Sequence, residues 1–539
     1  MGVSARVVTA ELPLMAAVKQ RQLGAYYTPD SAADFMASWL VRHDEERVLE
    51  PSFGDGTFLR AVSANGRNRN FNALRMVGVE INEIAVGRTA CDRLIASAEL
   101  RCEDFLNVHP FPVNAVIGNP PYVRLRRLPS VQRSMALQSA ERSMGRPMDP
   151  SGSLWMPFVL HAMQFLERGG RLAFVLPYDF TYVRYARPLW HALSRRFGSL
   201  ELLRTRERLF PDLLQDVVIL LADDYASSTT EVRYKAFERA GDLFHSRPVV
   251  DETVKVADVV NGERTFLNAL LDGQLRDLLK SRIAALTVPA RNLVTFNIGY
   301  VAGDKEFFHP TARQIRNFKL PSSALHKSIS SARTIKGAGL RTSSLDSSVT
   351  DRLFLPAARE LTDAEIQYTK LGEENGAAQR YKCRIRKPWF MVPGVRVPDV
   401  VVTVFSERPV LLLNDANYFA SNSFLCGYRL GVTADAFATC WYTSLTLLQC
   451  ELEVHALGGG VMILVPREAG CLRLPRDVSP DAAQLGRVDA FLRQGKALEA
   501  YTAGDREVLM RQVGLEQREV ELIREGIRTL EHWRTSARP

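Results

Sequence analysis

The sequence lacks the features that mark a membrane protein, a disulfide-linked protein or a zinc protein. Its apolar runs are as short as Val217 to Ala222, whereas a membrane-spanning helix needs roughly 18 apolar residues. The 7 cysteines are scattered and form no C-x-x-C pair, which argues against a disulfide framework and a structural zinc site. Residues 1–19 have no long apolar core of a secretory signal. We therefore predict a protein of the reducing cytoplasm with neither a membrane nor a metal partner.

Acidic residues are in deficit. The 539 residues include 60 Asp and Glu against 69 Lys and Arg, a formal net charge of +9, which is compatible with a polyanionic partner. The pattern G-x-x-x-x-G-K-[ST] is absent, which argues against a P-loop nucleotidase. The length predicts two to four domains.

The first half of the chain alternates short apolar strands with amphipathic helical stretches. The expected strands are 47–50, 76–80, 114–118, 171–176 and 217–222. Such alternation predicts an α/β fold with a mostly parallel sheet and helices on both faces. Because ligands of such sheets bind at the carboxyl ends of the strands, we expect the functional residues there.

A glycine turn follows the first expected strand, in Glu50-Pro51-Ser52-Phe53-Gly54-Asp55-Gly56. Gly54 and Gly56 allow the backbone to approach a ligand closely. Glu80 ends the next strand, where a carboxylate can accept both ribose hydroxyls of a nucleoside. Asp104 and Phe105 end the strand after that, where the Asp104 carboxylate can accept from an adenine amino group and Phe105 can pack on the adenine ring. Together these residues predict a nucleoside-binding edge.

The loop Asn119-Pro120-Pro121-Tyr122 follows the fourth expected strand. Two prolines stiffen it and remove competing N–H groups. The Asn119 amide oxygen and the Pro120 carbonyl can hold a planar NH2 group and draw its lone pair out of conjugation, while Tyr122 can stack on a base. Positioning of a poor nucleophile is most of such chemistry, so no covalent nucleophile is required.

These motifs resemble those of the S-adenosylmethionine-dependent adenine-N6 DNA methyltransferases with a C-terminal target-recognition domain. The resemblance implies a Rossmann-like methyltransferase sheet and the cofactor S-adenosylmethionine. It also implies a catalytic role for Asn119, Pro120, Pro121 and Tyr122. The implied cofactor-binding residues are Thr28, Glu50, Pro51, Gly54, Gly56, Glu80, Ile81, Asp104, Phe105, Asn119 and Phe158.

Two further segments fit this resemblance. Gly24 to Pro29 is similar to the segment that closes over the methionine end of the cofactor, and we expect Thr28 to cap a helix with Pro29 at its first position. Arg208-Leu209-Phe210-Pro211 resembles the motif whose Phe stacks on the target base. Enzymes that act on a base inside a duplex extrude it, and Tyr122 and Phe210 would enclose the extruded adenine.

The resemblance predicts a catalytic domain over 1–235 and a target-recognition domain over 236–475. The helical spacing of apolar residues such as Val488 and Ile523 predicts a helical segment over 476–539. The segment Ser322 to Ser348 has loop composition. Basic residues of the predicted target-recognition domain are candidate contacts to the phosphates of double-stranded DNA. They are Lys327, Arg333, Lys336, Arg341, Arg384, Arg386 and Lys387. Gly458 to Gly460 permits a close approach of backbone, either to DNA or to another strand.

The predicted partner is double-stranded DNA in the bacterial cytoplasm, with a separate restriction endonuclease possible. A C5-cytosine methyltransferase needs a nucleophilic Cys after a Pro, and no cysteine here follows a proline. N4-cytosine methylation shares the amine chemistry and stays open, as does an RNA or protein-glutamine N-methyltransferase with the same loop. A specificity subunit without catalysis is the non-enzymatic alternative.

Overall fold

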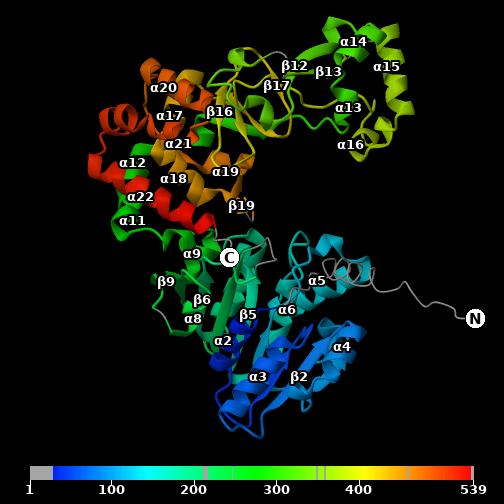
Figure 1. Ribbon diagram of the computed structural model, residues 1–539, viewed down its shortest axis with the longest axis vertical. Coiled ribbons are helices and arrows are strands. Elements are labelled where there is room, and N and C mark those ends of the chain that lie inside the picture. The colour runs from blue at the N-terminus through cyan, green and yellow to red at the C-terminus, as the bar shows by residue number, and fades with distance from the viewer. Residues whose placement is uncertain are drawn as a thin grey trace, which may run out of the picture. The chain divides into compact units, whose positions relative to one another are not determined.

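The computed structural model describes residues 28–210, 216–245, 247–346, 350–356, 360–457 and 460–535. They form two compact units, one that extends to Leu270 and one from Leu271 to Thr535. Figure 1 colours the first from blue to green and the second from green to red. Within these residues no helix combines the length and the apolar character needed to cross a membrane.

The first unit is built on a mixed sheet of nine strands. Their spatial order is β3 (Glu99–Cys102), β2 (Arg75–Glu80), β1 (Arg47–Glu50), β4 (Val113–Gly118), β5 (Leu166–Pro177), β7 (Val217–Tyr225), β6 (Phe197–Thr205), β8 (Glu231–Phe237) and β9 (Val250–Lys255). Strands β3, β2, β1, β4 and β5 are mutually parallel, whereas β7 is antiparallel to β5 and β6. The five predicted strands are all present, and the carboxyl ends of β1 to β5 meet at one edge.

Helices connect these strands and cover the sheet. They are α2 (Asp30–Leu40), α3 (Thr57–Asn68), α4 (Glu83–Ala90), α5 (Ser130–Met144), α6 (Trp155–Ala162), α7 (Arg187–Ser194), α8 (Asp242–His245), α9 (Val256–Asn261) and α10 (Thr265–Asn268). Met36 and Leu40 of α2 are fully buried, as their spacing predicts. Successive residues of a strand point to opposite faces, and Phe174 and Val175 of β5 are both inaccessible. Both faces of the sheet are therefore covered.

The start of α2 differs from the prediction. The helix begins at Asp30, its N-cap is Pro29, and no side chain caps it. The expectation that Thr28 caps this helix is therefore wrong. Its hydroxyl accepts a hydrogen bond from Asn119 instead.

The sheet of the first unit continues beyond residue 235, because β8 pairs with β6 and β9 pairs with β8. The division of the chain by contacts falls at Leu271. The functional boundaries at 235/236 and 475/476 stay predictions.

The second unit contains small sheets and many helices. The sheets are β10 (Thr287–Pro289) with β21 (Arg473–Pro475); β11 (Val294–Ile298), β18 (Phe424–Arg429), β14 (Val400–Thr403) and β16 (Leu411–Leu413); β13 (Asp351–Phe354), β12 (Leu325–Ile329) and β17 (Phe419–Ala420); and β15 (Phe405–Ser406), β20 (Val461–Ile463) and β19 (His455–Leu457). The helices are α11 (Gly273–Leu278), α12 (Ala284–Leu286), α13 (Lys305–Phe308), α14 (Ala312–Phe318), α15 (Asp363–Glu374), α16 (Tyr381–Arg384), α17 (Ala434–Trp441), α18 (Ser444–Glu453), α19 (Pro466–Cys471), α20 (Ala482–Arg493), α21 (Ala497–Thr502) and α22 (Gln517–Arg534).

The predicted helical end of the chain is confirmed over the residues described. Val488 of α20 and Ile523 of α22 are fully buried, as their helical spacing requires. The loop predicted from Ser322 to Ser348 is wrong in part, because β12 lies within it. Ile329 at the end of β12 is fully buried in an apolar cluster, and this burial outweighs the polar composition around it.

Candidate active site

A glycine turn joins β1 to α3 at the carboxyl edge of the first sheet. Gly54 and Gly56 have φ of +54° and +80°, a region that L-residues with a Cβ rarely adopt. A Cβ at Gly56 would lie 2.9 Å from Thr89, whereas one at Gly54 would meet nothing within 4 Å. The backbone at Gly54 is thus open on the side where a ligand would approach.

Glu80 lies directly against this turn. One carboxylate oxygen accepts the N–H of Gly54 at 3.0 Å and the other accepts the N–H of Asn82 at 2.9 Å. Each oxygen has two lone pairs, so the carboxylate can accept further hydrogen bonds. The next side chain, Ile81, is 52% exposed. The end of β2 therefore presents an acceptor beside an uncovered apolar surface.

Glu50 occupies a different environment. Its side chain is buried, and its carboxylate accepts the N–H of Leu59 in α3 at 3.1 Å. Burial, followed by the nearby charge of Asp55, raises the pKa of Glu50 well above its usual value. The carboxyl group anchors α3 to the end of β1, and its role as a cofactor ligand stays a prediction.

Asp104 and Phe105 lie just after β3. The Asp104 carboxylate accepts the N–H of Leu106 at 3.0 Å and so caps a short 3-10 turn. The Phe105 ring is buried, with its centroid 5.4 Å from that of Phe158 on α6. His161 of α6 bonds the Val108 carbonyl at 3.0 Å through Nε2. The structure thus brings the predicted residues 104, 105 and 158 together and fixes their loop from α6.

Asn119 is held at the carboxyl end of β4 by residues from two other segments. Its side-chain nitrogen donates to the Thr28 hydroxyl at 3.4 Å, and its backbone carbonyl accepts from the Ser52 hydroxyl at 3.3 Å. A Cβ at Gly118 would lie 3.3 Å from Pro51, so the loops after β1 and β4 approach closely. The predicted cofactor turn and the predicted catalytic loop are therefore neighbours.

Tyr122 ends the catalytic loop and leans on β5. Its hydroxyl donates to the Val175 carbonyl at 3.1 Å. Burial, with a smaller contribution from Asp179, raises the pKa of Tyr122 well above its usual value. The phenol therefore stays neutral and keeps its hydrogen bond throughout the physiological pH range.

A group of polar residues beside Tyr122 was not among the predicted site residues. Arg124 lies 3.6 Å from the Asp179 carboxylate and donates to the Tyr185 hydroxyl at 3.3 Å. Asp179 lies two residues beyond the end of β5, so the rule that strand ends meet at one edge could have indicated it. Burial raises the pKa of Asp179. This group fixes the chain immediately after the catalytic loop.

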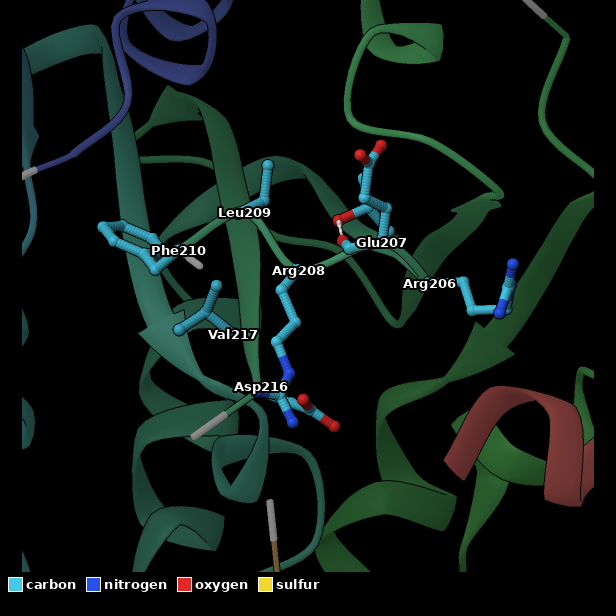
Figure 2. A pocket seen from close by; sticks show the side chains of 8 residues that line it. Arg206, Glu207, Arg208, Leu209, Phe210, Asp216 and Val217 are labelled. Carbon is cyan, nitrogen blue, oxygen red and sulfur yellow. Dashed lines mark hydrogen bonds between the residues drawn. The ribbon is translucent and has the colours of Figure 1, made fainter. Parts of the chain in front are cut away.

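Phe210 packs in the same apolar cluster against which Tyr122 rests. Figure 2 shows its ring pointing away from Arg206 and Glu207, with Val217 beside it and Arg208 extending toward Asp216. The cavity that these residues line has a volume of about 10 Å³, enough for one water molecule at most. A base would have to reach the ring from another side, and its stacking role stays a prediction.

The remaining predicted site and contact residues fall into three groups. Residues 24–27, 211, 458 and 459 lie outside the described residues. In the second unit, Arg341 pairs with Asp435 at 2.6 Å and Arg386 donates to the Ala302 carbonyl at 2.7 Å. These two guanidinium groups hold the protein together, whereas the remaining predicted phosphate contacts are exposed. The exposed ones are Lys327, Arg333, Lys336, Arg384 and Lys387.

Comparison with known proteins adds independent information. A family model described as N-6 DNA Methylase matches residues 11–184, and one described as the C-terminal domain of the type II methyltransferase M.Eco57I matches residues 263–509. Type II methyltransferase M.AccI of Acinetobacter calcoaceticus is 23% identical over 433 residues, 76% of each chain. Type II methyltransferase M.BanIII of Aneurinibacillus aneurinilyticus is 28% identical over 186 residues, 29% of this chain and 31% of the relative.

Among solved structures, the type IIL restriction-modification enzyme MmeI in complex with DNA covers 96% of this chain and 78% of its own, with a TM-score of 0.52 and 10% identity. This likeness shows a shared fold. The two family models and the type II relatives decide between the activities that the catalytic loop alone left open. Together, the two family models and the type II relatives identify an N6-adenine DNA methyltransferase of type II restriction-modification systems.

Proposed function

We propose that the methyl donor is S-adenosylmethionine, bound along the carboxyl ends of β1, β2 and β3. The residues fit this ligand. The backbone at Gly54 is open, Glu80 offers acceptors for ribose hydroxyls, and Ile81 exposes an apolar surface next to them. When bound, the donor supplies an electrophilic methyl group.

The remaining predicted ligands surround the same edge. Asp104 would accept the adenine amino group, and Phe105 and Phe158 would form the apolar wall. Thr28 contacts Asn119 and would stand at the methionine end. Glu50 would contribute indirectly, because its carboxylate anchors α3, the helix that follows the glycine turn.

The loop after β4 would hold the target amine. The Asn119 side-chain oxygen and the Pro120 carbonyl would each accept one hydrogen bond from N6 of adenine, which draws the nitrogen lone pair out of the ring. Since the Asn119 side chain donates its nitrogen to Thr28, its oxygen is directed to the other side of the amide. Pro121 stiffens the loop, and Tyr122, held to β5, would stack on the base.

The substrate would be double-stranded DNA from which the adenine is extruded, because N6 inside a duplex is out of reach of any pocket. We assign target recognition to the second unit. A restriction endonuclease on a separate chain would be the partner of such an enzyme, and both would act on DNA in the bacterial cytoplasm.

One observation carries the proposal: Asn119 is held beside the open glycine turn, by Thr28 at its side-chain amide and by Ser52 at its backbone carbonyl. The test uses Asn119→Ala and a matched control, Asn72→Ala, at an exposed position far from this edge. We expect Asn119→Ala to lower N6-methyladenine formation by a factor of about 10² to 10⁴, with donor affinity by calorimetry largely kept. Full activity of Asn119→Ala would refute the assigned role.

A further inference from the structure

The chain that follows the catalytic loop is strongly basic. No Asp or Glu occurs between Asp104 and Glu141, while Arg124, Arg126 and Arg127 fall within six residues of Tyr122. The arginines therefore face no acidic residue close in sequence. This segment therefore carries a local excess of positive charge next to the proposed base pocket.

The backbone that bears these arginines is fixed. Leu125 is fully buried, and its N–H donates to the Gly152 carbonyl at 3.0 Å. The Val123 carbonyl accepts from the N–H of Leu154 at 2.8 Å. Residues Leu125–Arg127 form one 3-10 turn. The side chains of this turn are thus presented from a firm position rather than from a free loop.

The arginines of this turn differ from Arg124. Arg124 is engaged with Asp179 and Tyr185. Arg126 and Arg127 are exposed, and across the part of the chain that the structure describes neither side chain has an ion pair or hydrogen bond. Among the described residues, neither guanidinium group is buried or forms an ion pair that would stabilise the fold. Both are therefore available to bind a partner.

The position of the turn indicates what that partner is. Consecutive Cα atoms are about 3.8 Å apart, so the Cα of Arg126 lies within about 15 Å of that of Tyr122. A DNA strand carries one phosphate per roughly 3.4 Å of helix axis. A strand that delivers its adenine to Asn119 and Tyr122 therefore places several phosphates within reach of this turn.

We propose that Arg126 and Arg127 bind phosphates of the DNA strand that carries the target adenine. The inference rests on the proposed function and extends it, because it gives the catalytic unit its own contact to the DNA backbone. Phosphate contacts fix register and orientation but read no sequence. The turn would therefore hold the strand beside the pocket on any DNA, and sequence choice would come from elsewhere.

The test compares two double variants that remove the same charge. Arg126→Gln with Arg127→Gln removes the proposed contacts. Arg168→Gln with Arg195→Gln removes two exposed arginines, one near the amino end of β5 and one just before β6, at the opposite edge of the sheet. Binding of a fluorescein-labelled random-sequence duplex is measured by anisotropy over a series of KCl concentrations, and donor affinity by calorimetry.

We expect the first variant to bind the duplex at least about tenfold more weakly. The magnitude of the slope of the log association constant against log KCl concentration should also fall by about 1.8, since each of the two phosphate contacts contributes about 0.9. The Arg168 and Arg195 variant should keep the wild-type slope, and Arg126→Lys with Arg127→Lys should restore most of it. Unchanged donor affinity shows that each variant is folded.

Equal salt-dependence slopes for the two glutamine variants would overturn the inference. In that case, methylation of duplex DNA by the wild-type enzyme would still support the proposed function. A wild-type enzyme that neither binds nor methylates duplex DNA would instead overturn the proposed function, and this inference with it.

Discussion

The polar groups at the strand-end site of the first unit have different partners from two buried carboxylates of the second unit. In the second unit, Glu451 meets Arg534 at 2.8 Å, and Asp505 meets both Ser444 and Arg524. In the first unit, Glu50 and Asn119 lie at the ends of β1 and β4 and bond mainly to backbone and hydroxyl groups. Matched charges stabilise a fold internally, whereas carboxyl and amide groups gathered at strand ends can serve a ligand.

The largest expected effect concerns the ion pair in the second unit. Arg534→Ala leaves the Glu451 carboxylate buried without its cation, and burial already raises the pKa of Glu451. We expect the free energy of unfolding to fall by about 3–5 kcal/mol, measured by urea denaturation, with donor affinity unchanged. Arg528→Ala, an exposed change on the same helix, is the control. If Arg534→Ala instead lowered donor affinity with little loss of stability, the ion pair would serve ligand binding and not the fold.

Phe210 gives the next largest effect. Phe210→Leu keeps an apolar side chain in the cluster but removes the ring, so about 1–3 kcal/mol of base stacking should be lost. We expect weaker extrusion, measured as reduced fluorescence of 2-aminopurine placed at the target adenine, and a lower methylation rate. Phe210→Trp should retain more of both. An unchanged fluorescence signal in Phe210→Leu would leave Phe210 with a packing role only.

Thr28 offers a finer test of the strand-end site. Thr28→Val keeps the shape of the side chain but removes the acceptor for the Asn119 amide. Loss of one such hydrogen bond, about 1.4 kcal/mol, corresponds to a tenfold lower kcat. Thr28→Ser should behave like wild type, and duplex affinity should not change. Equal kcat for the Val and Ser variants would show that this contact does not position the catalytic amide.

The smallest effect is a pH dependence of stability. The raised pKa of Glu50 means that the folded state binds its proton more tightly than the unfolded state does. The stability from this group is therefore present below the unfolded pKa and is lost as pH rises through the folded pKa. We expect the unfolding free energy of Glu50→Gln to fall less than that of the wild type as the pH rises above the ordinary carboxyl pKa of 4.5. An identical pH profile for both proteins would contradict this.

Much of the first unit could be predicted from local patterns. The five strands, the glycine turn and the order of Glu80, Asp104 and Asn119 all follow from short segments whose apolar runs and turns are self-contained. The antiparallel β7 between β5 and β6 could not be predicted, because strand order is decided by packing of the whole sheet.

The contacts that complete the site are long-range. Thr28 and Asn119 are 91 positions apart, so the local pattern at Thr28-Pro29 suggested a helix cap and missed the tertiary partner. Arg124 and Asp179 belong to different segments, and neither lies in a motif. In the second unit, β12 escaped prediction because its polar composition hides the burial of Ile329.

In the proposed mechanism, one edge of the first sheet holds both the donor and the target amine. A crystal structure of the enzyme with a non-transferable donor analogue and its methylatable duplex would locate both ligands at once. We expect the analogue to lie against Gly54 and Glu80, with N6 of an extruded adenine bonded to Asn119 and to the Pro120 carbonyl. An analogue bound elsewhere, or an adenine that remains stacked away from residues 119–122, would contradict it.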